Sequence, residues 1–148
     1  MNECDFFSSP IGLGHVTRDI AIARNLHEFS INFITGSGAA KMLQKLDFKI
    51  DDVYNPPSFI VNEGILKNQT KWLWNYFHYY KNCKNISEKV LKTNRTDLVI
   101  SDEDFASLTV AQNLKIPNIL ITDVLETKFT KGIASLIERK MNKSMMNI

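Results

Sequence analysis

The amino-acid sequence predicts an α/β fold of the Rossmann-like, doubly wound kind, built on a mostly parallel sheet. Two observations predict it. Short apolar runs suited to buried strands alternate along the chain with longer segments whose apolar residues recur at helical spacing. No repeat, low-complexity tract or interdomain linker interrupts this alternation. Strand–helix–strand units joined by right-handed crossovers give a parallel sheet covered by helices, so we expect a single domain over residues 1–148.

The first part of the chain is expected to supply three strands, at Cys4–Ser8, Ile31–Thr35 and, more weakly, Lys49–Tyr54. A glycine-bearing turn at residues 10–14 leads into a helix predicted over His15–Glu28. That helix has two adjacent apolar stripes, Val16-Ile20-Ala23 and Ile22-Leu26-Phe29. Its polar residues fall largely outside both stripes: Arg18, Asp19, Arg24 and Asn25. After the second strand, Gly36-Ser37-Gly38 forms a turn and a short helix is predicted over Ala39–Leu46.

The second part continues the alternation after a loop indicated by Asn55-Pro56-Pro57-Ser58. Its predicted elements are helices at Asn68–Leu91, Glu103–Leu114 and Lys131–Met146, and strands at Asp97–Ser101 and Asn118–Thr122. Ser101 and Asp104 fit a capping box at the start of the Glu103–Leu114 helix, which gives Asp104 a structural role. The last helix is amphipathic and leaves an apolar stripe with no obvious partner in the chain.

Composition excludes several classes of function. A net charge of +2 is too small for the clustered basic face that nucleic-acid binding requires. The two cysteines, Cys4 and Cys83, lie far apart, and no His/Cys cluster has zinc spacing, so we expect no metal, cofactor or disulfide framework. The first residues carry acids where a signal peptide carries bases, and no apolar run approaches the roughly 20 residues of a membrane span. We therefore expect a cytoplasmic protein.

The most specific segment joins the first strand to the first helix. Gly12 and Gly14 allow a tight turn and the close approach of a ligand, and the helix N-terminus presents free N–H groups suited to a phosphate. Thr17 and Arg18 complete this predicted acceptor- or phosphate-binding set. A dinucleotide fingerprint would need a third glycine at Thr17 and an acid where residues 35–37 read Thr-Gly-Ser, so NAD binding is disfavoured. The GxxxxGK[ST] pattern of a P-loop is absent from the sequence.

This segment resembles the opening loop of GT-B glycosyltransferases, most closely family 28, which includes the MurG-type N-acetylglucosaminyltransferases. There the first strand ends in a glycine-rich turn, followed by Gly-His and a helix of the form xxRxxAxAxxL. The matching residues here are Gly14-His15, Arg18, Ala21, Ala23 and Leu26. A second match, residues 97–102 followed by an apolar helix and Lys115-Ile116-Pro117, is similar to the DLVISD…A…L.IP stretch of the same proteins.

The resemblance covers nearly the whole chain but only the N-terminal, acceptor-side half of such an enzyme. It implies the N-terminal domain of a GT-B fold without the donor-binding C-terminal domain. Transfer of a hexose or N-acetylhexosamine from a UDP-sugar, UDP-N-acetylglucosamine above all, would then need that domain or a partner subunit. The acceptors of such enzymes are often lipid-linked. The MurG type has a richer glycine run before the histidine, and Ile11 and Leu13 interrupt that run here. The contacts of this turn with a phosphate of the acceptor are therefore expected to differ from those of the MurG type.

His15 and Asp102 are the predicted catalytic residues. His15 follows the first strand and Asp102 ends the fourth, and in a doubly wound sheet the strand order reverses between these two strands. Ligands bind at that switch point, outside the carboxyl ends of the strands. A histidine suits proton removal from a hydroxyl near neutral pH, and a carboxylate beside it fixes the tautomer. The resemblance implies this base role for His15, and an acceptor that is already a phosphate would instead use it, with Arg18, to bind charge.

Aromatic residues cluster at 72–80, flanked by Lys67, Lys71, Lys81 and Lys84. One helix cannot hide so many rings on a single face, so some are expected to point outward or into a pocket. Such a rim could rest on anionic lipid, as a peripheral contact with the cytoplasmic face of a membrane, and the alternative is a helix packed on both sides. His78 is expected to belong to this packing.

Three hypotheses for function remain open. The first is the acceptor half of a glycosyltransferase, whose nucleotide-sugar donor is held by another domain or subunit. The second is a non-catalytic subunit that recruits a donor-binding partner to the membrane. The third is a small module that binds a phosphorylated ligand. Only the first needs the imidazole of His15, so replacing that residue separates it from the second.

Overall fold

The computed structural model describes residues 1–58, 61–62, 65–66, 68–123, 135–136, 139 and 143, and it contains the predicted parallel sheet. Five strands take the order β3-β2-β1-β6-β7, with every neighbouring pair parallel. They are β1 Asn2–Ser8, β2 Phe29–Thr35, β3 Lys49–Asp52, β6 Leu98–Asp102 and β7 Asn118–Ile121. The order reverses between β1 and β6, so the doubly wound, Rossmann-like prediction is confirmed.

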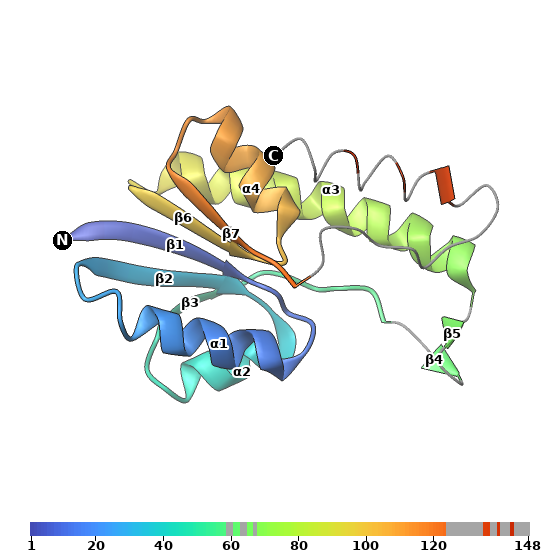
Figure 1. Cartoon of the computed structure of the whole chain (residues 1–148), viewed down its shortest axis with the longest axis horizontal. Helices are drawn as coiled ribbons and strands as arrows, with labels where there is room; N and C mark the ends of the chain where they lie inside the picture. The colour runs from blue at the N-terminus through green and yellow to red at the C-terminus, as the bar shows by residue number, and fades with distance from the viewer. Residues whose placement is uncertain are drawn as a thin grey trace.

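Helices cover both faces of the sheet, as Figure 1 shows. The helices are α1 Leu13–Ala23, α2 Ser37–Gln44, α3 Gln69–Thr93 and α4 Phe105–Asn113. α1 and α2 cover one face, and α3 and α4 cover the other. The alternation of side chains along β1 separates the two cores: Phe6 packs with residues of α1 and α2, while Phe7 packs with residues of α3 and α4. No helix in the described ranges is long and apolar enough to cross a membrane.

Helix α1 is shorter than the predicted His15–Glu28 at its carboxyl end. Backbone hydrogen bonds from Asn25 to Ile22 and from Leu26 to Ala23 tighten the chain into a turn after Ala23. Leu26 still packs against the core on the α1 side, although it is no longer helical. The apolar stripe therefore predicted the buried residues correctly and the end of the helix wrongly, because a turn can also bury an apolar side chain.

Two features of the backbone were not predicted. The short strands β4 (Val61–Asn62) and β5 (Ile65–Leu66) pair antiparallel in a separate two-stranded sheet. Gly36 lies so close to the chain after β3 that a Cβ atom built on it would be 1.8 Å from the carbonyl oxygen of Tyr54. Only glycine permits this approach.

The predicted Lys131–Met146 helix lies outside the described residues except at 135–136, 139 and 143.

Candidate functional site

The loop after β1 places the N-terminus of α1 at the carboxyl edge of the sheet. Gly12 has φ +87, in the left-handed region that favours glycine, and it occupies the N-cap position of α1. Because glycine has no side chain, Gly12 cannot accept a hydrogen bond from the first N–H groups of the helix, and no acid lies in the first turn. A Cβ atom at Gly14 would meet nothing within 4 Å. The start of α1 is therefore open to a ligand.

His15 and Asp102 meet across the β1–β6 boundary. Asp102 ends β6 opposite Ser8, the last residue of β1, and its side chain is fully buried. His15 stands in the first turn of α1, and its Nδ1 atom lies 3.2 Å from Oδ1 of Asp102. The imidazole is 26% exposed. A buried carboxylate thus holds one side of a histidine ring that solvent can still reach.

Arg18 holds the same carboxylate from one turn further along α1. Its Nη2 donates to both oxygens of Asp102, at 2.8 and 3.0 Å, and its Nε donates to Oδ2 at 3.3 Å. Its Nη1 donates to Asp123, which follows β7, at 2.6 Å. These two carboxylates raise the pKa of the Arg18 guanidinium above its already high ordinary value, chiefly through the hydrogen bond with Asp102. Arg18 is therefore a permanent positive charge that fixes Asp102.

The position of Arg18 also bears on the tautomer of His15. Nη2 of Arg18 lies 3.3 Å from Nδ1 of His15, so Nδ1 faces both a cation and a carboxylate. Arg18 already donates to Asp102 at a shorter distance, whereas Asp102 can only accept. Nδ1–H donating to Asp102 satisfies both groups and leaves the lone pair on Nε2 free. In this arrangement His15 can take a proton at Nε2 and share the resulting charge with Asp102.

A second aspartate lies behind the first. Asp19 is fully buried, and its Oδ2 accepts a hydrogen bond from the hydroxyl of Ser8. Burial, together with the neighbouring carboxyl of Asp102, raises the pKa of Asp19 to about 8. In the sequence Asp19 falls largely outside the apolar stripes of its helix, yet it is one of the most buried polar residues in the protein.

The structure brings three of the predicted site residues into direct contact, namely His15, Arg18 and Asp102. Gly12 and Gly14 lie beside them at the start of α1. Thr17 is exposed, and its hydroxyl donates to the carbonyl of Leu13 at 2.8 Å, within the helix. The contact between His15 and Asp102 follows the topological prediction, and the chemical roles of all six residues stay predictions.

Sequence reasoning missed Asp19, Asp123 and Ser8. Neither Ser8 nor Asp19 belongs to a motif. Ser8 ends the first strand and Asp19 follows Arg18 in the first helix, so both lie at the switch point. Within the described ranges, no group of three or more His, Cys, Asp or Glu residues is arranged to hold a metal ion.

Asp104 has the structural role predicted for it, by a different arrangement. It is itself the N-cap of α4, and its Oδ1 accepts from the backbone N–H groups of Ala106 and Ser107. Its Oδ2 accepts a 2.6 Å hydrogen bond from the buried hydroxyl of Tyr54. Ser101, the predicted cap, instead contacts the hydroxyl of Ser107. The capping box was misplaced because strand β6 extends through Ser101 to Asp102.

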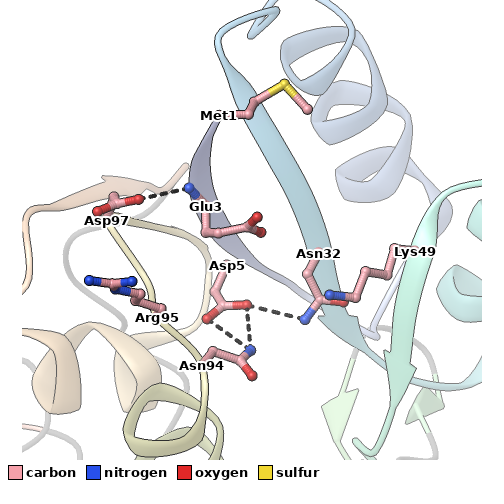
Figure 2. A pocket seen from close by; sticks show the side chains of 8 residues that line it. All are labelled: Met1, Glu3, Asp5, Asn32, Lys49, Asn94, Arg95 and Asp97. Carbon is pink, nitrogen blue, oxygen red and sulfur yellow. Dashed lines mark hydrogen bonds between the residues drawn. The ribbon is translucent and has the colours of Figure 1, made fainter.

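The opposite, amino-terminal edge of the sheet carries a pocket of about 630 Å³. Figure 2 shows Asp5 in its wall, bonded to Asn94 on one side and Asn32 on the other. The other lining residues are Met1, Glu3, Lys49, Arg95 and Asp97. Acids and bases mix here, and the pocket contains none of the predicted site residues.

No protein-family model and no curated protein sequence matches this chain. Solved structures do match it in fold. The glycosyltransferase of kitacinnamycin has a TM-score of 0.67 at 13% identity, over 94% of this chain and 33% of that one. MurG from Acinetobacter baumannii has a TM-score of 0.60 at 15% identity, over 94% of this chain and 39% of that one. The C-terminal domain of the PF1911 hydrogenase from Pyrococcus furiosus has a TM-score of 0.55 at 15% identity, over 80% of this chain and 89% of that one.

At these identities the likeness shows the fold, which is the Rossmann-like α/β fold of a GT-B glycosyltransferase domain. This chain spans between a third and two fifths of the length of the two glycosyltransferases. The hydrogenase domain shares the architecture under another name, so the fold alone does not select an activity.

Proposed function

We propose that this chain is the acceptor-side domain of a GT-B glycosyltransferase and that His15 is its general base. The observation that carries the proposal is the contact between His15 and the buried Asp102 at the strand-order reversal. Ligands of doubly wound folds bind at this place. The open start of α1 and the exposed part of the imidazole leave room there for an acceptor.

In the proposed reaction, Nε2 of His15 takes the proton of an acceptor hydroxyl as its oxygen attacks the anomeric carbon of the donor sugar. The new glycosidic bond forms while the bond to the nucleotide diphosphate breaks, and the diphosphate leaves with the electron pair. Asp102 accepts the Nδ1–H hydrogen bond and stabilises the imidazolium that results. Arg18 keeps Asp102 in place, since its donor groups are engaged by Asp102 and Asp123.

The donor is proposed to be a UDP-sugar held by a further domain or a partner subunit. We keep a hexose or N-acetylhexosamine as the transferred group and a lipid-linked acceptor as the first to test. Family 28 remains the resemblance that motivates these choices.

The test is UDP release from UDP-sugars when the purified chain is added to an extract of its source cells, which supplies acceptor and partner. Wild type is compared with His15→Ala and with Arg95→Ala, a matched control at the opposite edge of the sheet. Release that rises with wild type and Arg95→Ala but not with His15→Ala supports the proposal. No stimulation by any of the three proteins contradicts it.

Exposed aromatic rings on α3 favour a second candidate, the recruiting subunit. Trp74 is 63% exposed and Phe77 is 45% exposed, and the ammonium of Lys81 lies 5.4 Å from the centre of the Phe77 ring. Rings and lysines together suit an anionic lipid surface. This candidate predicts that His15→Ala stimulates UDP release as well as wild type does. It also predicts that Trp74→Ala weakens binding to phosphatidylserine vesicles.

A further inference from the structure

Asp19 is a buried acid that the proposed reaction does not use. It is fully buried beneath α1, and the hydroxyl of Ser8 from β1 donates to its Oδ2. Its other oxygen, Oδ1, is buried and receives no hydrogen bond from any described donor. Ser8 is the register partner of Asp102, and Arg18, the residue before Asp19, binds the fully buried Asp102 carboxylate. Two buried carboxyl groups therefore lie side by side.

Two adjacent buried carboxyl groups cannot both ionise, because their charges repel where water screens them little. The partners decide which group keeps the proton. Asp102 receives three hydrogen bonds from the guanidinium of Arg18 and faces Nδ1 of His15. Asp19 receives one hydrogen bond, from a neutral hydroxyl. Arg18 acts on Asp19 only through the field of its charge. The negative charge belongs on Asp102 and the proton on Asp19.

We propose that Asp19 is a neutral carboxylic acid at physiological pH and that it donates a hydrogen bond to Asp102, which positions this carboxylate for His15. Asp19 would thus be a positioning residue, third in a line that runs from the imidazole through Asp102 into the core. The protonation rests on burial and contacts alone, whereas the positioning role rests on the proposed function. The two can therefore fail separately.

The protonation has a consequence for stability. The pKa of Asp19 is raised to about 8 in the folded protein from an ordinary value of 3.8, so its contribution to stability is fully present below about pH 4. That contribution is lost as the pH rises toward 8, because the unfolded chain releases the proton and the folded chain retains it. One retained proton changes the unfolding equilibrium constant by up to about tenfold per pH unit in this window.

The experiment compares urea unfolding of wild type and Asp19→Asn by circular dichroism between pH 5 and pH 7.5. Asparagine is a suitable control because its amide can donate to Asp102 and accept from Ser8 without a charge. We expect the ratio of the two unfolding constants, wild type over variant, to rise severalfold to tenfold per pH unit. A ratio that stays constant with pH would overturn the proposal. If Asp19→Asn does not fold, ¹³C NMR titration of the wild-type carboxyl decides: a midpoint above pH 7 supports the proposal and one near pH 4 overturns it.

The positioning role is tested by UDP release in source-cell extract with Asp19→Asn and Asp19→Ala. We expect Asp19→Asn to keep activity within about threefold of wild type, and Asp19→Ala to lose about tenfold or more, because alanine removes the hydrogen bond proposed from Asp19 to Asp102. The pH profile of Asp19→Asn should remain flat above pH 7.5, where wild type begins to lose the Asp19 proton. Equal activity of both variants would overturn the positioning role even where the protonation holds.

Discussion

Two buried aspartates lie at opposite edges of the same sheet and are held by different kinds of partner. Asp5, in the middle of β1 and in the wall of the pocket, accepts hydrogen bonds from Asn32, Asn94 and Thr96, all of them neutral donors. Asp102, at the end of β6, accepts from a guanidinium, faces an imidazole and lies near the second buried carboxyl group, that of Asp19. The first set of partners joins β1 to β2 and to the chain before β6. The second set consists of one permanent cation, the guanidinium of Arg18, and two groups that can gain or lose a proton, the imidazole of His15 and the carboxyl of Asp19.

The difference shows which buried charge is a candidate for chemistry. A carboxylate surrounded by neutral amide and hydroxyl donors has a fixed environment and ties elements together. A carboxylate among ionisable groups, at the strand edge where ligands bind, can help to move a proton. The pocket that Asp5 lines lies at the amino-terminal edge of the sheet, and the ionisable cluster lies at the carboxyl edge.

The largest effect that would sharpen this comparison is on activity. We expect His15→Ala to lower UDP release in source-cell extract by about 10²- to 10⁴-fold, the usual contribution of a positioned base. Because the ring is 26% exposed, the variant should lose no more than about 1 kcal/mol of unfolding free energy. Circular dichroism in urea checks the stability. If the variant is inactive only because it is unfolded, the loss of activity would not show that the His15–Asp102 edge takes part in the chemistry.

The reverse pattern is expected for Asp5→Ala. Its loss leaves the amides of Asn32 and Asn94 and the hydroxyl of Thr96 without their acceptor, which should cost about 3 kcal/mol of unfolding free energy. Asp5→Asn keeps the shape and one acceptor oxygen, so it should cost less. UDP release per folded molecule should equal that of wild type for both variants. A tenfold fall in that specific activity would break the comparison, since Asp5 would then act in the chemistry.

Arg18→Leu should cost about 2 kcal/mol of unfolding free energy, because it leaves the buried Asp102 without its cation. Arg18→Lys should cost less in stability, since lysine keeps the positive charge and loses only the bidentate hydrogen bonding to Asp102. Asp123 is the matched partner on the solvent side, 60% exposed, so Asp123→Asn should change stability by no more than about 0.5 kcal/mol. Urea titrations measure all three variants. Equal costs for Arg18→Leu and Asp123→Asn would show that the contact with Asp102 contributes nothing.

A small effect of the opposite sign is expected at Gly14. A Cβ atom there meets only open space, and alanine favours the helix, so Gly14→Ala should stabilise the protein by about 0.5 to 1 kcal/mol. If an acceptor approaches the start of α1, the added methyl group stands in its way and UDP release should fall at least tenfold. Melting curves and the release assay are run on the same preparation. A more stable variant with full activity would place the acceptor elsewhere.

Topology made the site partly predictable from the sequence. The contact between His15 and Asp102 follows from strand order, which the alternation of apolar runs and helical stripes already indicates. Asp19 was not predictable in this way. A polar residue beside an apolar stripe is usually solvated, and only the closeness of β6 to α1 buries it. Asp123 could not be found either, because nothing in the sequence fixes where the chain turns after β7.

Short-range features of the fold were the least predictable. The pairs of residues that form β4 and β5 are too short to show a period. The sequence marks Gly36 as part of a turn, but the close approach of the Tyr54 carbonyl depends on how β3 leaves the sheet. The aromatic cluster was predicted to divide between inside and outside, and it does: Tyr79 and Tyr80 pack against the core while Trp74 and Phe77 are exposed. His78 is exposed against Trp74 rather than packed inside.

The position of the aromatic rings also decides what optical spectroscopy can report. The sequence has two tryptophans, and both lie in the first two turns of α3: Trp72, stacked on Tyr76 with ring centres 5.0 Å apart, and the exposed Trp74. Tryptophan fluorescence therefore reports the beginning of one helix, far along the chain from His15. If that segment loosens before the sheet, emission will change at lower urea concentration than circular dichroism does. Fluorescence will then serve as a local probe of partner or lipid contact at α3, while circular dichroism measures the stability of the domain.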